Sequence, residues 1–376
     1  MGGGARREFV LGWEARLLVV ITAVLVVFGL AAVYSASSVL VEGGKQLGSA
    51  RVQDQLLGVG IGVVLFLIAS RINLDRLREL AWPLIGLTAV MLLILVLPFT
   101  HSIAPRQFGA RRWLDLGVSI QVSELAKLAI VVWVAMLCAK KGKDVRRLSR
   151  GALPVFVVVG PLAALMLMQP DLSVAVQVTF IAAIVLFAAG ARIGHFIVLG
   201  ALAVPILWSH ISKVQYQLLR LIAFADPGAA RPAERYQLEQ SLIGVGSGQL
   251  LGVGFGNGQQ KLGFLPLPYS DFIFATIAEE WGFVGVVAIV GLYLTFVLVA
   301  LRLARAAADP FRQYLGIGCA ALIGGDAFLH IAVSLGIAPN TGLVLPFISH
   351  GRSALLVAFV VTGLIVNLGT KRREKI

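Results

Sequence analysis

Long, uninterrupted apolar runs constrain the fold of this chain more than any other feature. Several of them reach the ~20 residues that a helix needs to cross the hydrocarbon core of a bilayer. The runs are continuous and do not alternate, so the short strands of a membrane barrel are excluded. Charged residues make up only 14% of the chain, well below the roughly 25% of soluble domains. The pattern predicts an all-α polytopic membrane protein.

Ten membrane segments are predicted, within a single transmembrane domain that covers residues 1–376. They span residues 15–38, 53–70, 80–98, 121–139, 152–169, 172–190, 193–210, 271–300, 312–335 and 344–368. Most of the 32 Lys and Arg residues lie near the chain ends or in the connections that would share their side of the membrane. By the positive-inside rule, both termini are expected in the cytoplasm. The net charge of +13 is therefore interpreted as a topology signal, and no nucleic acid partner is expected.

Two connections on the opposite side are too long to be simple turns. One covers about 99–120, and the other, the large extracellular loop, covers about 211–270. Loops of this length are usually functional or disordered, and the apolar and glycine content of the second one argues against disorder. We expect it to lie partly against the membrane and to contain short helices, the first around RYQLEQSLIGVG at 235–246.

The end of this loop, LPLPYSDFIFATIAEEWGFVG at 265–285, sets a carboxylate at the mouth of an apolar helix. Asp271 can serve either as a helix cap or as a catalytic base. Lys261 and the pair Glu279 and Glu280 lie close to it in the sequence, which favours a functional site.

A glycine run at 244–258 precedes that stretch. Its glycines either permit positive φ and close backbone packing, or they turn N–H groups toward an anionic headgroup. A nucleotide-binding loop is not expected, because no parallel strand precedes the run and no GK[ST] ending follows it.

Several charged residues lie where a membrane protein seldom places them. Arg111 and Arg112 fall on the outer side with Trp113, a pattern typical of either phosphate binding or interfacial anchoring. Glu124 and Lys127 are three residues apart on one helix, and such charges inside a membrane segment face either a cavity or each other.

Polar residues also stand at the outer ends of two later segments. Asp171 follows Pro170 and either stabilises a helix N-terminus or belongs to a site. Ser349 and Arg352 interrupt the last apolar region, where they either hold an anion or satisfy a helix break. Cys138 and Cys319 lie in apolar segments and are interpreted as small core residues, without a disulfide framework.

An ordered set of motifs resembles the SEDS family of polytopic peptidoglycan glycosyltransferases, which includes RodA, FtsW and SpoVE. The motifs are VYSAS (33–37), GARRWLDLG (109–117), QVSELAKLA (121–129), QPDLSVAV (169–176), YQLEQSLIGVGSG (236–248), GFGNGQQKLGFLP (254–266), DFIFATIAEEWGFVG (271–285) and LPFISHGRSALL (345–356). They cover nearly the whole chain, and the set is far more specific than any one of them.

The resemblance implies an enzyme that polymerises lipid II, a disaccharide pentapeptide on undecaprenyl diphosphate, at the outer face of the bacterial cytoplasmic membrane. It assigns the essential carboxylate to Asp271. Candidate substrate-binding residues are Arg111, Arg112, Trp113, Glu124, Lys127, Asp171, Gln240, Ser241, Lys261, Ser349 and Arg352. It also implies a class B penicillin-binding protein as partner, together with other membrane proteins of the divisome or elongasome. No cofactor is required by the sequence, and a divalent cation, Mg²⁺ or Mn²⁺, stays open as a means of stabilising the diphosphate.

The chain departs from the family pattern at two places. Tyr269 and Ser270 stand where many members have a His-Thr pair, and Arg352 adds a charge where glycine is common. GARRWLDLG, QQKLGFLP and LPFISHG favour the division branch, FtsW, over the elongation branch, RodA, without resolving the two. A lipid II flippase and a non-catalytic scaffold of the division machinery remain as alternative functions, because intramembrane charges also mark transport routes.

Overall fold

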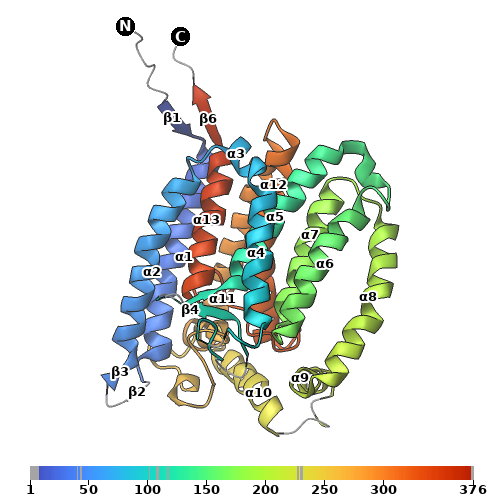
Figure 1. Ribbon diagram of the computed structural model, residues 1–376. Coiled ribbons are helices and arrows are strands. Elements are labelled where there is room, and N and C mark those ends of the chain that lie inside the picture. The colour runs from blue at the N-terminus through green and yellow to red at the C-terminus, as the bar shows by residue number, and fades with distance from the viewer. Residues whose placement is uncertain are drawn as a thin grey trace.

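The computed structural model describes residues 8–39, 41–42, 45–100, 102–106, 110–115, 117, 119–226, 228 and 232–373. Helices dominate this part of the chain and stand side by side in one bundle, with the first and last described segments, 8–11 and 370–373, at the same end of it (Figure 1). The helices are α1 (Trp13–Ser37), α2 (Leu47–Ala69), α3 (Leu74–Glu79), α4 (Ala81–Val96), α5 (Val122–Lys141), α6 (Ala152–Met168), α7 (Leu172–Ala188), α8 (Ile193–Lys213), α9 (Gln215–Ala225), α10 (Pro232–Ser247), α11 (Ile273–Arg305), α12 (Pro310–Ser334) and α13 (Arg352–Leu368).

Short elements complete the bundle. Two 3₁₀ helices, η1 (Gly142–Arg146) and η2 (Gln260–Leu262), lie in connections. Three antiparallel strand pairs are described: β1 (Glu8–Leu11) with β6 (Thr370–Arg373), β2 (Val41–Glu42) with β3 (Lys45–Gln46), and β4 (Trp113–Asp115) with β5 (Ser119–Gln121). The β4–β5 hairpin lies at the end of the connection predicted at about 99–120, for which the sequence analysis named no secondary structure.

Six of the described helices are long and apolar enough to cross a membrane: α1, α2, α5, α8, α11 and α12. The shorter apolar helices α4, α6, α7 and α13 run beside them in the bundle (Figure 1). Helix α5 is the central one, since most of its residues are buried, including Trp133. No residue of α8 is buried, and this helix stands apart from its neighbours. The predicted all-α, multi-pass class is confirmed.

Glycines allow helices α2 and α13 to pack closely. Gly58 and Gly62 of α2 lie one turn apart and face α13, because a Cβ on them would stand 3.2 Å from Leu355 and 2.2 Å from Phe359, respectively. Two small residues four positions apart let membrane helices approach with their backbones nearly in contact. This contact holds the middle of α2 against α13.

Helix α11 is broken at Gly282, whose backbone has φ 63° and ψ −164°. The glycine-rich loop, which follows α10 and ends at Gly258, packs its own backbone into this break. Val253 and Gly254 donate N–H bonds to the carbonyls of Glu279 and Glu280, at 3.0 and 3.1 Å. Beyond the break, the N–H groups of 283 and 284 donate to the carbonyls of 249 and 250. The freed backbone groups of a membrane helix are thereby satisfied, as a bilayer requires.

Two predicted boundaries were wrong. The first helix of the large extracellular loop is α9, and the predicted helix around 235–246 is the second, α10. The last helix begins at Arg352 instead of 344, because Phe347 has a positive φ of 68° and Gly351 is extended. The preceding residues, 344–351, form a loop that reaches the end of the bundle opposite the termini, where the candidate site lies.

Candidate functional site

Asp271 lies in the turn just before α11, at the end of the bundle opposite the chain termini. The Ser270 hydroxyl donates a hydrogen bond of 2.9 Å to Asp271 Oδ1. The hydroxyl of Ser349 donates to the carbonyl of Ser270 at 2.8 Å, so the loop before α13 fixes the backbone beside the carboxylate. Burial raises the pKa of the Asp271 carboxyl above its usual value, and the hydrogen bond from Ser270 opposes that rise.

A cavity of about 280 Å³ lies near this carboxylate, and residues of the loop at 338–343 line it. Its wall is mostly apolar and is formed by α7, α9, the end of α12 and the loop at 338–343; the polar residues in it are Arg112, Asp171, Ser173, Gln217, Arg220, Asn340 and Thr341. Asp271 is not in the wall itself but directly behind it, since a Cβ on Gly342 would be 3.4 Å from Asp271 Oδ2. The positive charges of Arg220 and Arg112 also act on the carboxyl and lower its pKa, against the effect of burial.

Arg112 joins the β4–β5 hairpin to the gap between α6 and α7. Its guanidinium lies 3.6 Å from the carboxylate of Asp171, and it donates to the carbonyls of Gln169 and Pro170 at the end of α6. Asp171 is the N-cap residue of α7 and is almost fully buried. The two sequence candidates therefore meet in the cavity wall, while each also has a structural role.

Arg220 is the second cation of the cavity, and the sequence analysis did not select it. It lies on α9 and donates to the carbonyl of Asn340 at 3.2 Å. The Asn340 amide in turn donates to Gln237 of α10 at 2.7 Å. The amphipathic pattern of α9 was hidden inside a segment interpreted as loop, which is why its arginine was missed.

Glu124 and Lys127 form a buried cluster with Asp326 of α12. The Lys127 ammonium lies 2.9 Å from Glu124 and 3.0 Å from Asp326, and all three side chains are nearly inaccessible. Asp326 also escaped selection, because nothing in its local sequence links it to a residue 199 positions away. The cluster is close enough to Asp171 for both Glu124 and Lys127 to affect the pKa of that carboxyl.

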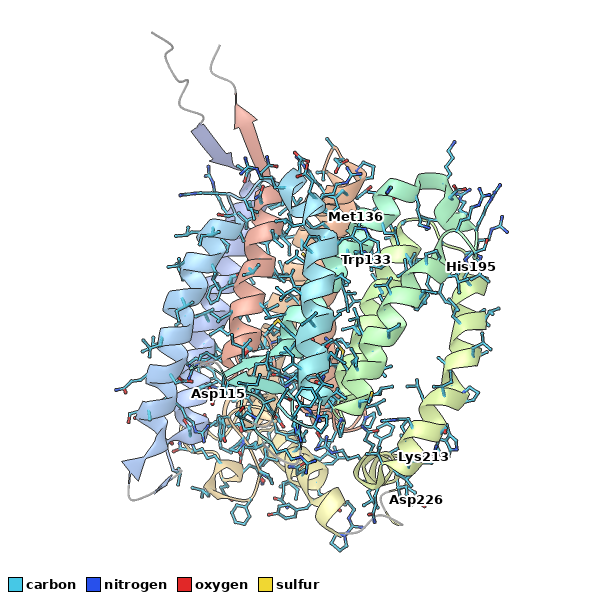
Figure 2. All side chains as sticks on the ribbon, in the orientation of Figure 1. Asp115, Trp133, Met136, His195, Lys213 and Asp226 are labelled. Carbon is cyan, nitrogen blue, oxygen red and sulfur yellow. The ribbon has the colours of Figure 1, made fainter. Side chains whose placement is uncertain are left out.

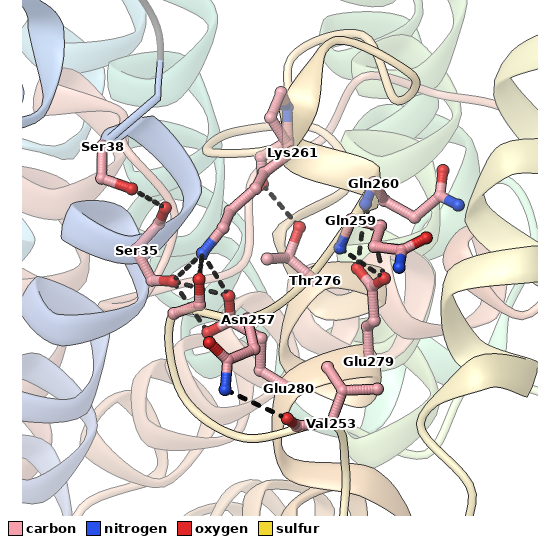
Figure 3. A network of polar contacts seen from close by, with 12 residues as sticks. Ser35, Ser38, Val253, Asn257, Gln259, Gln260, Lys261, Thr276, Glu279 and Glu280 are labelled. Carbon is pink, nitrogen blue, oxygen red and sulfur yellow. Dashed lines mark hydrogen bonds and ion pairs between the residues drawn. The ribbon is translucent and has the colours of Figure 1, made fainter.

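Lys261 belongs to a separate network that docks the glycine-rich loop (Figure 3). Its ammonium lies 2.7 Å from Glu280 and donates to the Ser35 hydroxyl of α1 at 2.8 Å. Glu279 accepts the backbone N–H of Gln259 at 2.8 Å. The lysine is 2% exposed and lies outside the cavity lining, so its contacts here are those of a structural anchor.

The other candidates lie around this end of the bundle without converging on the cavity. Arg111 donates to the carbonyl of Leu97, and Trp113 pairs with Gln121 in the hairpin.

Ser241 is buried and donates to the carbonyl of Ser334, which ties α10 to α12. Gln240, on the same helix, is half-buried. Arg352 forms an ion pair with Asp54 of α2.

Gln217 of α9 is a further residue that the sequence analysis missed. It is buried in the cavity wall, and neither polar atom of its amide has a hydrogen-bond partner among the described residues. A buried polar group without a hydrogen bond costs about 1–3 kcal/mol of folding stability. An unpaired amide in a cavity wall is therefore more typical of a binding site than of a packed core.

Comparisons with known proteins identify the family to which the chain belongs. The family model described as "Cell cycle protein", FTSW_RODA_SPOVE, matches residues 15–374. This chain belongs to that family. A probable peptidoglycan glycosyltransferase FtsW of Trichlorobacter lovleyi is 35% identical over 364 residues, covering 96% of this chain and 95% of the relative.

Solved structures of the family have the same fold. A chain from a study of how a peptidoglycan synthase complex coordinates polymerization and crosslinking has a TM-score of 0.76 and 28% identity, covering 96% of this chain and 97% of that one. The rod shape determining protein RodA of Thermus thermophilus has a TM-score of 0.70 and 27% identity, covering 97% and 98%. The membrane helices of this chain are thus arranged as in its family.

Proposed function

We propose that this chain is a peptidoglycan glycosyltransferase that polymerises lipid II into glycan strands at the outer face of the bacterial cytoplasmic membrane. The observation that carries the proposal is the Asp271 carboxylate, held behind the wall of a cavity that also contains Arg112 and Arg220. The names of the relatives support the same activity. The relative of Trichlorobacter lovleyi is named FtsW, and this name favours a division role over the elongation role of RodA.

Asp271 acts as the general base. It accepts the proton of the 4-hydroxyl of the acceptor sugar while that oxygen attacks the anomeric carbon of the donor. The bond from this carbon to undecaprenyl diphosphate breaks, and its electron pair leaves on the diphosphate. The product is inverted at that carbon, and the proton stays on Asp271 until solvent removes it. Because the leaving group is already stable as an anion, no general acid is needed.

The arginines stabilise the charge that develops on the diphosphate. Arg112 and Arg220 belong to different elements, so they can contact an anion from two sides of the cavity. The cluster of Glu124, Lys127 and Asp326 joins α5 to α12 through buried ion pairs. The apolar part of the wall suits the lipid carrier, which stays anchored in the bilayer.

In this proposal the chain crosses the membrane ten times, through α1, α2, α4, α5, α6, α7, α8, α11, α12 and α13. Both termini are cytoplasmic, and α9, α10 and the glycine-rich loop lie outside. Asp115, Lys213 and Asp226 mark the outer end of the bundle, and His195 marks the inner end (Figure 2). The site then faces the compartment in which the glycan is assembled.

A class B penicillin-binding protein is proposed as the partner. A glycan strand becomes a wall only after crosslinking, and residues 1–376 contain no SxxK motif for transpeptidation. The structural relative from a complex that couples polymerization to crosslinking supports this pairing. Other membrane proteins of the divisome or elongasome are expected to join the pair.

A role for Mg²⁺ or Mn²⁺ stays a prediction. Among the described residues, no three His, Cys, Asp or Glu side chains gather as a metal site. A cation that arrives with a diphosphate needs only one or two protein carboxylates, and Asp271 and Asp171 are the ones near the cavity. Chelation with EDTA followed by addition of either cation tests the requirement.

A polymerisation assay with lipid II in detergent tests the proposed activity. Purified chain, with and without a cognate penicillin-binding protein, is compared as wild type, Asp271→Ala and the matched control Glu239→Ala, an exposed acid of α10. We expect glycan from the wild type and the control, and none from Asp271→Ala. Since lipid II in detergent needs no flipping, a flippase would give no polymer in any arm. Unimpaired polymer from Asp271→Ala would contradict the mechanism.

A further inference from the structure

Three polar residues share one face of α2 at its outer end. Arg51, Asp54 and Gln55 are spaced at i, i+3 and i+4, so they point the same way from the helix. The face continues to Gly58, where the packing is close enough that a Cβ would lie 3.5 Å from the Arg352 side chain. This face is therefore pressed against the loop before α13 and the start of that helix.

Asp54 is the acid of this face, and two basic side chains from the other side of the contact lie against it. Its carboxylate forms an ion pair with Arg352 and lies 3.2 Å from Nε2 of His350. Arg51 lies one turn away on the same helix. Asp54 is thus the one acid facing these three basic side chains among the residues that the structure describes. Removing its charge leaves Arg352 without its ion-pair partner.

The loop bound by Asp54 in turn binds the chain segment that carries the catalytic carboxylate. The backbone N–H of His350 donates to the carbonyl of Tyr269 at 3.0 Å, and the His350 ring packs edge-on against the Tyr269 ring. The guanidinium of Arg51, a residue of α2, lies 3.6 Å from the centroid of the Tyr269 ring. Tyr269 is therefore held by His350, which contacts Asp54, and by Arg51, which lies on the same face of α2 as Asp54.

Ser349 continues the same connection. Its carbonyl accepts from the Gln55 amide at 3.2 Å, and its hydroxyl donates to the carbonyl of Ser270 at 2.8 Å. Ser270 then donates to Asp271. Helix α2 thus reaches the carboxylate through two short links, one by way of His350 and Tyr269 and one by way of Ser349 and Ser270.

We propose that Asp54 is a positioning residue for Asp271: by holding His350 and Arg352 against α2, it fixes the loop that sets the orientation of the catalytic carboxylate. The proposal rests on the proposed role of Asp271 as base. Displacing a reacting group by about 1 Å can cost about 100-fold in rate, so a loop anchor that touches no substrate can still limit turnover.

The charges around His350 decide how the anchor behaves with pH. Burial lowers the pKa of His350, Arg51 and Arg352 lower it further, and Asp54 raises it. The ring is therefore neutral at neutral pH, and the ion pair of Asp54 with Arg352 provides the charge contact.

The test compares Asp54→Asn, which keeps the shape and removes the charge, with Asp75→Asn. Asp75 is a matched control, because it also pairs with an arginine, Arg312, at the other end of the bundle. We expect Asp54→Asn to lower kcat for lipid II polymerisation about tenfold with KM changed less than about twofold. The acid limb of its pH–rate profile should move to lower pH, because a loosened Asp271 becomes hydrated and loses the burial that raises its pKa. Asp75→Asn should leave both unchanged.

The outcomes separate three roles. A normal kcat and pH profile per folded Asp54→Asn molecule, with only a lower melting temperature, would mean a merely structural ion pair and overturn the proposal. A raised KM at normal kcat would mean that the cluster binds substrate, and would also overturn it. If Asp54→Asn does not fold, Arg352→Gln is measured with the same criteria, and Asp54→Arg with Arg352→Asp should recover part of the lost kcat. Activity in Asp271→Ala would instead refute the proposed function.

Discussion

As the proposed base, the Asp271 carboxylate meets two opposing demands. The proposed reaction needs it ionised, whereas burial favours its neutral form and raises its pKa. Active sites hold such groups in spite of the cost, because a base with a raised pKa is a stronger acceptor at neutral pH. The hydrogen bond from Ser270 and the charges of Arg112 and Arg220 recover part of the cost.

This conflict predicts that Asp271→Asn abolishes polymerisation without lowering stability. The base is active only when ionised, so wild-type activity should rise with pH through the raised pKa and level off above it. For stability the sign is opposite: a carboxyl whose folded pKa is raised stabilises the fold at low pH and loses that contribution as pH rises through the folded pKa. At neutral pH the asparagine variant should therefore melt no lower than the wild type in detergent. A lower melting temperature would show that the carboxylate also holds the fold.

The local sequence around Asp271 offers it as either a helix cap or a base, because a proline-rich turn, an acid and an apolar helix are adjacent in the chain. Its assignment as the essential carboxylate comes from the family resemblance and stays a prediction, and its surroundings could not be predicted. Lys127 and Asp326 meet only because α5 and α12 pack together, and no local pattern encodes that pairing across 199 positions. Arg220 was missed for a different reason, since its helix lay inside a segment interpreted as loop.

Helix α11 gains its shape from one residue in a conformation that other residues rarely adopt. Gly282 has a positive φ, and a Cβ there would lie 2.3 Å from the backbone nitrogen of Gly252. We predict that Gly282→Ala lowers the stability by about 2 kcal/mol or more and releases the glycine-rich loop from α11. Hydrogen exchange of residues 249–254 and the melting temperature in detergent measure the two effects.

Gly291 is the matched control in the same helix, because a Cβ there would meet nothing within 4 Å. Gly291→Ala should be neutral or stabilise by about 0.5–1 kcal/mol, as expected for alanine in a helix interior. Equal effects of the two substitutions would contradict the inserted-loop account. The sequence shows 41 glycines and cannot tell which of them carries a positive φ, so the break in α11 could not be predicted from it.

The orientation of the bundle is predicted from charge. Hydrophobic length predicted most of the helices, and the distribution of Lys and Arg predicts cytoplasmic termini, which stays a prediction. The part that failed was the outer end, where α9, the β4–β5 hairpin and the loop at 344–351 are short and are held by tertiary contacts. Apolar periodicity carries little information for such pieces, because their neighbours and not their own sequence decide their conformation.

Thiol labelling tests the orientation without disturbing the site. Cys138 and Cys319 are both buried, so a membrane-impermeant maleimide should leave the unmodified chain unlabelled. Lys213→Cys, at the outer end of α8, should react in intact spheroplasts (Figure 2). Lys143→Cys, exposed in η1 at the other end, should react only after the membrane is permeabilised. The reverse pattern would place Asp271 in the cytoplasm, where no glycan strand grows, and a base held there could not serve the proposed reaction.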